Sequence, residues 1–368
     1  MSRRLAVYCP WLPPIRGGLP DHTLVLARAL AARGVDVVVL GRWGDPALLA
    51  PIPCRVGVTH WPGRTGLVAA CRATGAQSLL IQYVPFLFAR RGLAPYLIPT
   101  AVALRKARIR LGVFVHEPWV PPTRLVWRFT GPLMRQQLLA LVRRADVVFG
   151  AVPKFLDLVR PAVRPGVPVE LVSVGATLPV TAHDHGEARA ALGIAPGDVV
   201  VAVFSPGAVG ALPSWIERAA QALDGAPGVQ WLIFGHASDH LPASFPPAAR
   251  VRRLGVLDAP DASRALRAAD LALAPFVDGL TLRRSSALAA LAHGLPLVSS
   301  RGPLFDPFAG EAALCLESAD AFAEAVRDLV ADRDARAALA RACQEFYRTH
   351  ASMEVLARVV AFRLCEDG

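Results

Sequence analysis

The sequence predicts an α/β protein built from two successive Rossmann-like domains. Short apolar runs alternate with helical stretches, and this alternation starts again after residue 185. A strand, a helix and a second strand within roughly 35 residues form a βαβ unit, whose two strands are parallel. With 368 residues, the chain is long enough for two domains that each bury their own core.

The first βαβ unit opens the chain. An apolar run at residues 5–9 predicts a strand, and residues 21–33 predict a helix that ends at Gly34. The next apolar run, at residues 35–40, predicts the second strand. Further apolar runs, which we expect to complete the first sheet, occur at residues 78–81, 111–115, 147–151 and 169–174.

The second half repeats the pattern. Its apolar runs are at residues 199–204, 229–234, 251–254, 271–274 and 296–299. Between the halves, in residues 175–185, Pro, Gly, His and Asp replace the apolar runs, which is typical of a linker. We therefore expect domains at residues 1–175 and 186–350. His183, Asp184 and His185 lie in this linker, and we interpret them as solvated side chains rather than as metal ligands.

Composition narrows the class of protein. Hydrophobic residues make up 54% of the chain and charged residues 19%, which argues against disorder. No run of 18 apolar residues lacks a charge or a cluster of prolines, so no membrane span is predicted. Six cysteines without a CxxC pair predict a reduced, cytoplasmic protein without structural zinc.

The charge is distributed unevenly. Residues 1–175 carry 23 Lys or Arg against 7 Asp or Glu, whereas the rest of the chain carries 17 against 22. A basic half can meet a phosphorylated substrate, an anionic lipid surface or nucleic acid. Residues 124–144 could accordingly touch an anionic membrane, or they could form an ordinary arginine-rich surface helix.

The segment of residues 271–300 carries the strongest chemical signal. It contains an apolar strand, a polar loop with Arg283, Arg284, Ser285 and Ser286, a helix without polar side chains and another strand. The start of a helix presents unpaired N–H groups and a partial positive charge. Two serines and two arginines at that position suit an anion such as a diphosphate. The alternative is a capped core helix with two solvated arginines.

Two further candidate positions follow predicted strands in the first half. Gly17 and Gly18 precede the first helix, and glycines let a ligand approach the backbone closely, although a flexible turn is the alternative. His116 follows the strand at residues 111–115, where it could bond a sugar hydroxyl, act as acid or base, or be structural. The absence of GxGxxG leaves a nicotinamide cofactor unsupported, and no P-loop, GxSxG or HExxH motif is present.

Taken in order, these segments resemble family 4 glycosyltransferases of the GT-B fold. The resemblance rests on PPIRGGLPDHTLVLARALAARGVDVVVL, QYVP, VHEP, SVGATLP and ADLALAPF…DGLTLRRSSALAALAHGLPLVSS, and it covers nearly the whole chain. It implies two Rossmann-like domains facing across a cleft, with residues 351–368 forming a helix that packs back on the N-terminal domain. The N-terminal domain would hold the acceptor, and the C-terminal domain the nucleotide-sugar.

The activity that the resemblance implies is a retaining sugar transfer from a UDP- or GDP-linked donor, without a metal or another cofactor. Nucleic acid is not an expected partner, and the basic first half of the chain suits an acceptor that is phosphorylated, lipid-linked or acidic. His116 and Arg284 map onto catalytic positions. The donor diphosphate would be bound by Gly17, Gly18, Arg283, Arg284, Ser285 and Ser286. The neighbouring polar residues Asp21, His22, Glu117 and Asp278 are the expected contacts of the sugar or the acceptor.

The chain also departs from the family pattern. Many members carry two glutamates, and alignment on the HGLP segment places Thr281 and Ala289 at those positions. The Arg and Lys that commonly follow the first strand of the C-terminal domain are missing from residues 205–210. The chain looks closest to a subset with an RR-Ser helix start. A non-catalytic relative that binds sugar-nucleotides or glycans within a biosynthetic complex is therefore the alternative function.

Overall fold

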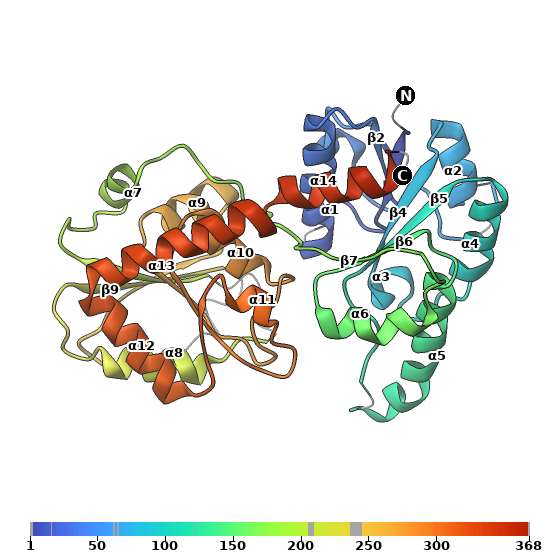
Figure 1. Cartoon of the computed structure of the whole chain (residues 1–368). Coiled ribbons are helices and arrows are strands. Elements are labelled where there is room, and N and C mark those ends of the chain that lie inside the picture. Colours follow the sequence, from blue (N-terminus) through green and yellow to red (C-terminus); the bar gives the residue numbers. More distant parts are fainter. Residues whose placement is uncertain are drawn as a thin grey trace. The chain divides into compact units, whose positions relative to one another are not determined.

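Two parallel β-sheets organise the computed structural model, and each belongs to its own unit (Figure 1). The structure describes residues 3–15, 17–61, 63–64, 66–121, 123–204, 210–235 and 245–366. Unit 1 comprises Met1–Val174 together with Met353–Gly368, and unit 2 comprises Gly175–Ser352.

Unit 1 contains a seven-stranded parallel sheet in the order β3-β2-β1-β4-β5-β6-β7. Its strands are β1 (Leu5–Tyr8), β2 (Val37–Leu40), β3 (Cys54–Arg55), β4 (Ser78–Tyr83), β5 (Arg110–Val115), β6 (Val147–Gly150) and β7 (Val169–Leu171). Its helices are α1 (Gly18–Ala32), α2 (Leu67–Thr74), α3 (Pro85–Phe88), α4 (Leu97–Lys106), α5 (Leu125–Val142), α6 (Pro153–Val159) and α14 (Met353–Leu364), with the 3-10 turns η1 (Pro46–Leu49) and η2 (Arg160–Ala162).

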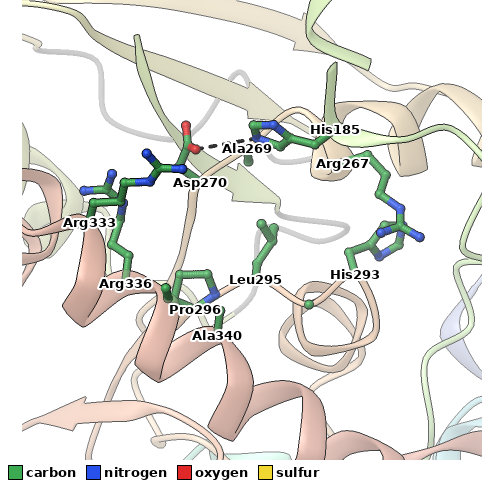
Figure 2. A pocket seen from close by; sticks show the side chains of 12 residues that line it. His185, Arg267, Ala269, Asp270, His293, Leu295, Pro296, Arg333, Arg336 and Ala340 are labelled. Carbon is green, nitrogen blue, oxygen red and sulfur yellow. Dashed lines mark ion pairs between the residues drawn. The ribbon is translucent and has the colours of Figure 1, made fainter. Parts of the chain in front are cut away.

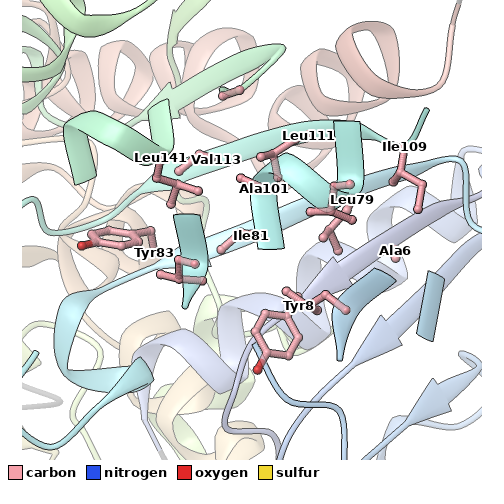
Figure 3. Close-up of a cluster of buried hydrophobic side chains, with 14 of the residues drawn as sticks. Ala6, Tyr8, Leu79, Ile81, Tyr83, Ala101, Ile109, Leu111, Val113 and Leu141 are labelled. Carbon is pink, nitrogen blue, oxygen red and sulfur yellow. The ribbon is translucent and has the colours of Figure 1, made fainter. Parts of the chain in front are cut away.

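The core of unit 1 forms because the central strands are mostly apolar and almost entirely buried. Figure 3 shows the cluster on one face, where Ala6 and Tyr8 of β1 pack beside Leu79 and Ile81 of β4. These positions alternate along each strand, so the residues between them, such as Leu80, point to the other face and are equally buried. Helices must therefore cover both faces, as in doubly wound folds.

The C-terminal helix α14 belongs to unit 1, although unit 2 precedes it in the sequence. It packs against α1, and the Ser78 hydroxyl at the start of β4 donates a 2.5 Å hydrogen bond to the Leu364 carbonyl. Arg363 donates to Glu170 of β7 at 2.8 Å. The end of the chain thus completes the sheet-and-helix layer that the beginning of the chain starts.

Unit 2 contains a six-stranded parallel sheet in the order β10-β9-β8-β11-β12-β13. Its strands are β8 (Val199–Phe204), β9 (Val229–Phe234), β10 (Arg250–Gly255), β11 (Leu271–Ala274), β12 (Leu297–Ser300) and β13 (Leu314–Leu316). Its helices are α7 (His185–Ala191), α8 (Pro213–Ala222), α9 (Ala259–Arg267), α10 (Ser285–Ala292), α11 (Pro307–Gly310), α12 (Ala319–Ala331) and α13 (Arg333–Phe346), with a π-helical turn η3 (Tyr347–Ala351).

Three local features differ from the sequence expectation. The edge strands β3 and β13 were not expected, because two or three residues are too few to produce a periodic pattern. Helix α1 begins at Gly18 instead of residue 21, since Pro20 fits the first turn of a helix, where its missing N–H is tolerated. In the linker, Asp184 and Glu187 form a capping box that starts α7.

All six cysteines are free thiols. Among the helices of the described residues, none has the length and apolar character needed to cross a bilayer.

Candidate functional site

The carboxyl ends of β1, β4 and β5 bring the N-terminal candidates to one edge of the unit 1 sheet. These three strands are neighbours and run parallel, so the loops that follow them emerge side by side. Gly17 and Gly18 follow β1, and His116 directly follows β5. This edge is where doubly wound sheets bind ligands.

The start of α1 is open to a ligand. Gly17 is the N-cap residue and no side chain caps the helix, so the first N–H groups are not satisfied by a cap. A Cβ atom built on Gly18 would meet nothing within 4 Å. Asp21 lies in the first turn and is exposed, and its negative charge opposes anion binding there. The open start of α1 therefore offers backbone donors with a reduced positive field.

His116 is held in a defined orientation. Its ring stacks on Phe114 with 4.1 Å between the ring centroids, and only 9% of the residue is exposed. Its Nε2 lies 2.6 Å from Oε1 of Gln82, which can only accept, so Nε2 carries the proton.

His22 lies against His116 with 5.2 Å between their ring centroids. It is 2% exposed, and its Nδ1 lies 2.9 Å from the Val174 carbonyl, to which it donates. Burial lowers the pKa of His22 to about 4, so the ring is neutral at pH 7. Among the described residues, its Nε2 atom has no hydrogen-bond partner. The ring of His22 thus packs edge-on against the ring of His116, whereas Glu117, the next residue along the chain, is exposed.

In unit 2, the loop between β11 and α10 carries the remaining candidates. Arg284 is the N-cap residue of α10, which begins at Ser285, and no side chain caps the helix. No serine hydroxyl therefore caps α10. Ser285 and Ser286 occupy the first turn, and Ser286 is 8% exposed. The first N–H groups of a buried helix thus lie next to two arginines, which is a favourable arrangement for an anion.

One carboxylate binds both arginines. Arg283 donates to Asp278 Oδ2 at 2.6 Å, and Arg284 forms an ion pair with Asp278 Oδ1. The guanidinium of Arg284 also lies 4.4 Å from the centroid of the Phe276 ring. All three charged side chains are at most 23% exposed. Arg283, Arg284 and Asp278 together carry a net positive charge. Because Asp278 orients the two arginines, we associate its carboxylate with the arginines more closely than with a sugar.

The loop that carries Asp278 is held by the loop after β12, which sequence reasoning missed. Ser300 accepts from the Phe276 N–H at 2.6 Å and donates to the Phe276 carbonyl at 2.7 Å. The Leu304 N–H donates to the Asp278 carbonyl at 2.8 Å. A Cβ atom on Gly302 would lie 2.6 Å from the backbone nitrogen of Gly279. The pair of glycines at 279 and 302 was the only signal for this contact.

The two positions that lack the family glutamates are both buried. Thr281 is 1% exposed, and its hydroxyl has no hydrogen-bond partner among the described residues. Ala289 lies inside α10 and is also 1% exposed. Most of the loop without the family Arg and Lys, residues 205–209, lies outside the described residues. Within the described part of the chain, no group of three His, Cys, Asp or Glu side chains could hold a metal ion.

A separate pocket of 260 Å³ lies at the opposite edge of the unit 2 sheet (Figure 2). Asp270 and Pro296, which precede β11 and β12, line it together with Arg333 and Arg336 of α13. His185 Nε2 of α7 lies 3.5 Å from Oδ1 of Asp270, so one histidine of the linker lies against this edge. None of the predicted site residues lines this pocket.

Comparison with protein families identifies one domain. Residues 201–332, which include β8, β11 and α10, match the family described as "Glycosyl transferases group 1". No curated protein matches the chain.

Solved structures resemble the whole chain. Sucrose-phosphate synthase from Thermosynechococcus elongatus is 20% identical, with 97% of each chain covered and a TM-score of 0.67. HepE from Anabaena, solved with UDP, is 19% identical, with 98% of each chain covered and a TM-score of 0.67. A glycosyltransferase from Rickettsia africae reaches a TM-score of 0.71 at 10% identity, with 99% of this chain and 98% of that chain covered. The chain therefore has the GT-B fold, and its residues 201–332 match a domain of group 1 glycosyltransferases.

Proposed function

We propose that the chain transfers a sugar from a UDP- or GDP-linked donor to an acceptor, with retention of configuration and without a metal. The observation that carries this proposal is the pair Arg283 and Arg284 beside the uncapped start of α10, inside the matched domain. UDP bound to HepE, and UDP-glucose in another structure of that protein, support a nucleotide-sugar donor.

The proposed reaction requires the site to stabilise negative charge on the leaving group. When the bond between the sugar and the diphosphate breaks, negative charge develops on the leaving diphosphate. Two guanidiniums and the first N–H groups of α10 can stabilise this charge, which is the task a metal ion performs in other enzymes. Asp278 holds the guanidiniums in place before the diphosphate arrives. In unit 1, we assign to His116 and Gly18 the positioning of the reacting sugars.

Replacing Arg284 with Ala tests the diphosphate site. We expect the affinity for UDP or GDP to fall by about 1.5–3 kcal/mol, the contribution of a charge-assisted hydrogen bond. Calorimetric titration of each nucleotide measures this loss. The matched control is Arg327→Ala, which removes an exposed arginine from α12 and should leave the affinity unchanged. Equal affinity in the Arg284 variant would show that this side chain does not bind the nucleotide.

Thr281 and Ala289 favour the second candidate, a non-catalytic relative that binds a sugar-nucleotide or glycan. Neither position can supply the carboxylates that many family members carry. A panel of UDP- and GDP-sugars separates the two functions. Release of UDP or GDP that depends on an acceptor, and persists in EDTA, supports the metal-independent enzyme. Nucleotide binding without turnover supports the binding protein.

For the acceptor, we propose a lipid-linked or otherwise anionic molecule that the protein meets at a cytoplasmic membrane surface. The support comes from the first half of α5. Leu125, Val126, Phe129 and Leu133 are 74%, 56%, 70% and 56% exposed. Arg124, Arg128 and Arg135 accompany them on the same segment, as in helices that lie in a lipid interface. Because α5 follows β5, this segment is on the edge of the sheet that carries His116.

Phe129→Glu tests this contact. A carboxylate on the apolar face should abolish co-sedimentation with vesicles that contain phosphatidylglycerol, because a charge cannot enter the acyl region cheaply. Val256→Glu, which alters an exposed valine of unit 2, is the control and should sediment like the parent chain. If both variants still sediment fully, α5 is not the membrane contact.

A further inference from the structure

A second cationic site lies at the amino edge of the unit 1 sheet, away from the loops that carry His116. A cavity of 640 Å³ is lined by four arginines, Arg3, Arg105, Arg108 and Arg110, and by a single carboxylate, Asp146. Arg3 precedes β1, Arg110 begins β5 and Asp146 precedes β6, which places the cavity where the strands start. The lining carries a net charge of +3.

The only carboxylate of the cavity is already bound elsewhere. Asp146 Oδ2 accepts from the Leu111 N–H at 2.9 Å, and Oδ1 accepts from Arg164 at 3.1 Å. Arg164 does not line the cavity. Within the described part of the chain, Arg105, Arg108 and Arg110 have no carboxylate at ion-pair distance. Arg105, Arg108 and Arg110 therefore repel one another without a paired carboxylate among the described residues.

Arg108 occupies a backbone position that favours glycine. Its φ of 57° is in the left-handed region, and among the described residues it is the one non-glycine with positive φ. It follows the C-cap of α4, where the Arg108 N–H donates to the Arg105 carbonyl and the Ile109 N–H to the Leu104 carbonyl, both at 3.0 Å. Glycine closes most helices of this kind. An arginine here keeps an unfavourable conformation and adds a guanidinium to the cavity.

We propose that this cavity binds a soluble compound with two or more phosphoryl charges. Guanidinium groups suit phosphate oxygens because each presents a planar pair of donors, and four of them in one cavity match several phosphate oxygens. The carboxyl edge of a doubly wound sheet is the place for substrates. A ligand at the amino edge therefore acts on unit 1 as an effector or stabiliser and does not react.

Pyrophosphate is the probe, and Arg108→Gly is the decisive variant. The titration uses the full chain with Arg283 and Arg284 replaced by alanine, so that the proposed diphosphate site of unit 2 does not contribute. We expect saturable binding that Arg108→Gly weakens by about 10-fold or more, the effect of one lost charge-assisted bond. The same substitution removes the left-handed strain, so the melting temperature without ligand should rise by about 2–4 °C. Loss of binding then cannot be attributed to unfolding.

Lys106→Ala is the matched control, because Lys106 is an exposed cation of α4 outside the cavity lining. If Lys106→Ala still binds pyrophosphate, the binding depends on the residues that line the cavity, which supports the proposal. If Lys106→Ala and Arg108→Gly weaken pyrophosphate binding equally, only the overall positive charge of the region matters, and the proposal is overturned. Absence of saturable pyrophosphate binding, or binding only to vesicles of phosphatidic acid, would overturn it as well.

Discussion

Gly302→Ala is expected to disrupt the loop of Asp278 and to remove most of the activity. The added Cβ would lie 2.6 Å from the Asp278 carbonyl carbon, 2.6 Å from the Gly279 nitrogen and 2.7 Å from the Val277 carbonyl oxygen. All three atoms are backbone, so no side chain can move aside to relieve the contact. Overpacking of this kind costs about 1–3 kcal/mol or more. The strain acts on the backbone of Asp278, whose carboxylate orients Arg283 and Arg284.

The comparison for this variant is Gly197→Ala, also in unit 2, whose added Cβ would meet nothing within 4 Å. Urea unfolding measures the stability of both variants, and release of UDP or GDP from a nucleotide-sugar measures activity. We expect the Gly302 variant to be less stable and to bind nucleotide more weakly, and the Gly197 variant to match the parent. A Gly302 variant with parental stability and nucleotide affinity would contradict the contact between the two loops.

Acid should destabilise the fold between about pH 6.5 and pH 4. Burial lowers the pKa of His22, His60 and His293 to about 4. In the unfolded chain the same rings titrate near pH 6.5, so below that pH the unfolded state binds more protons than the folded state. The free energy of unfolding therefore falls as the pH is lowered through this window and levels off below about pH 4. For His22, which is 2% exposed, the full effect is of the order of 3 kcal/mol.

His22→Gln tests this assignment. A glutamine amide can still donate to the Val174 carbonyl but does not titrate, so the variant should lose less stability between about pH 7.5 and pH 5 than the parent chain. His350→Gln, which replaces an exposed histidine, should retain the parental pH dependence. Urea midpoints at the two pH values give the measurement. An unchanged pH dependence in the His22 variant would rule out this ring as a source of acid sensitivity.

The central strands could be predicted from the sequence because their physical signal is local. β1 is apolar throughout and β4 and β5 are apolar over most of their length, since helices cover both faces of the sheet. The position of His116 at the end of β5 followed from the same reasoning. In contrast, β3 pairs only two residues with β2, and its existence depends on that neighbour. Edge strands of this length leave no trace in a single sequence.

The position of the candidate site in the chain could be predicted from the sequence, but the contacts among its side chains could not. Arg283, Arg284 and Asp278 were recognised as polar residues near a helix start, yet their mutual ion pairs depend on how the loop folds. That fold depends in turn on Ser300 and Gly302, which are about 20 residues further along the chain. Long-range backbone contacts of this kind have no sequence period, so pattern reasoning cannot find them.

The placement of α14 determines the order in which the two units can be completed during synthesis. Unit 2 is one continuous stretch, Gly175–Ser352, so every residue of its core has been made before α14 begins. Unit 1 starts first but lacks Val360, Ala361 and Leu364, all buried, until the whole of unit 2 has been synthesised. Because domains fold as units during synthesis, unit 2 can fold before unit 1 is complete. Until α14 has been synthesised, the part of unit 1 that α14 covers stays exposed.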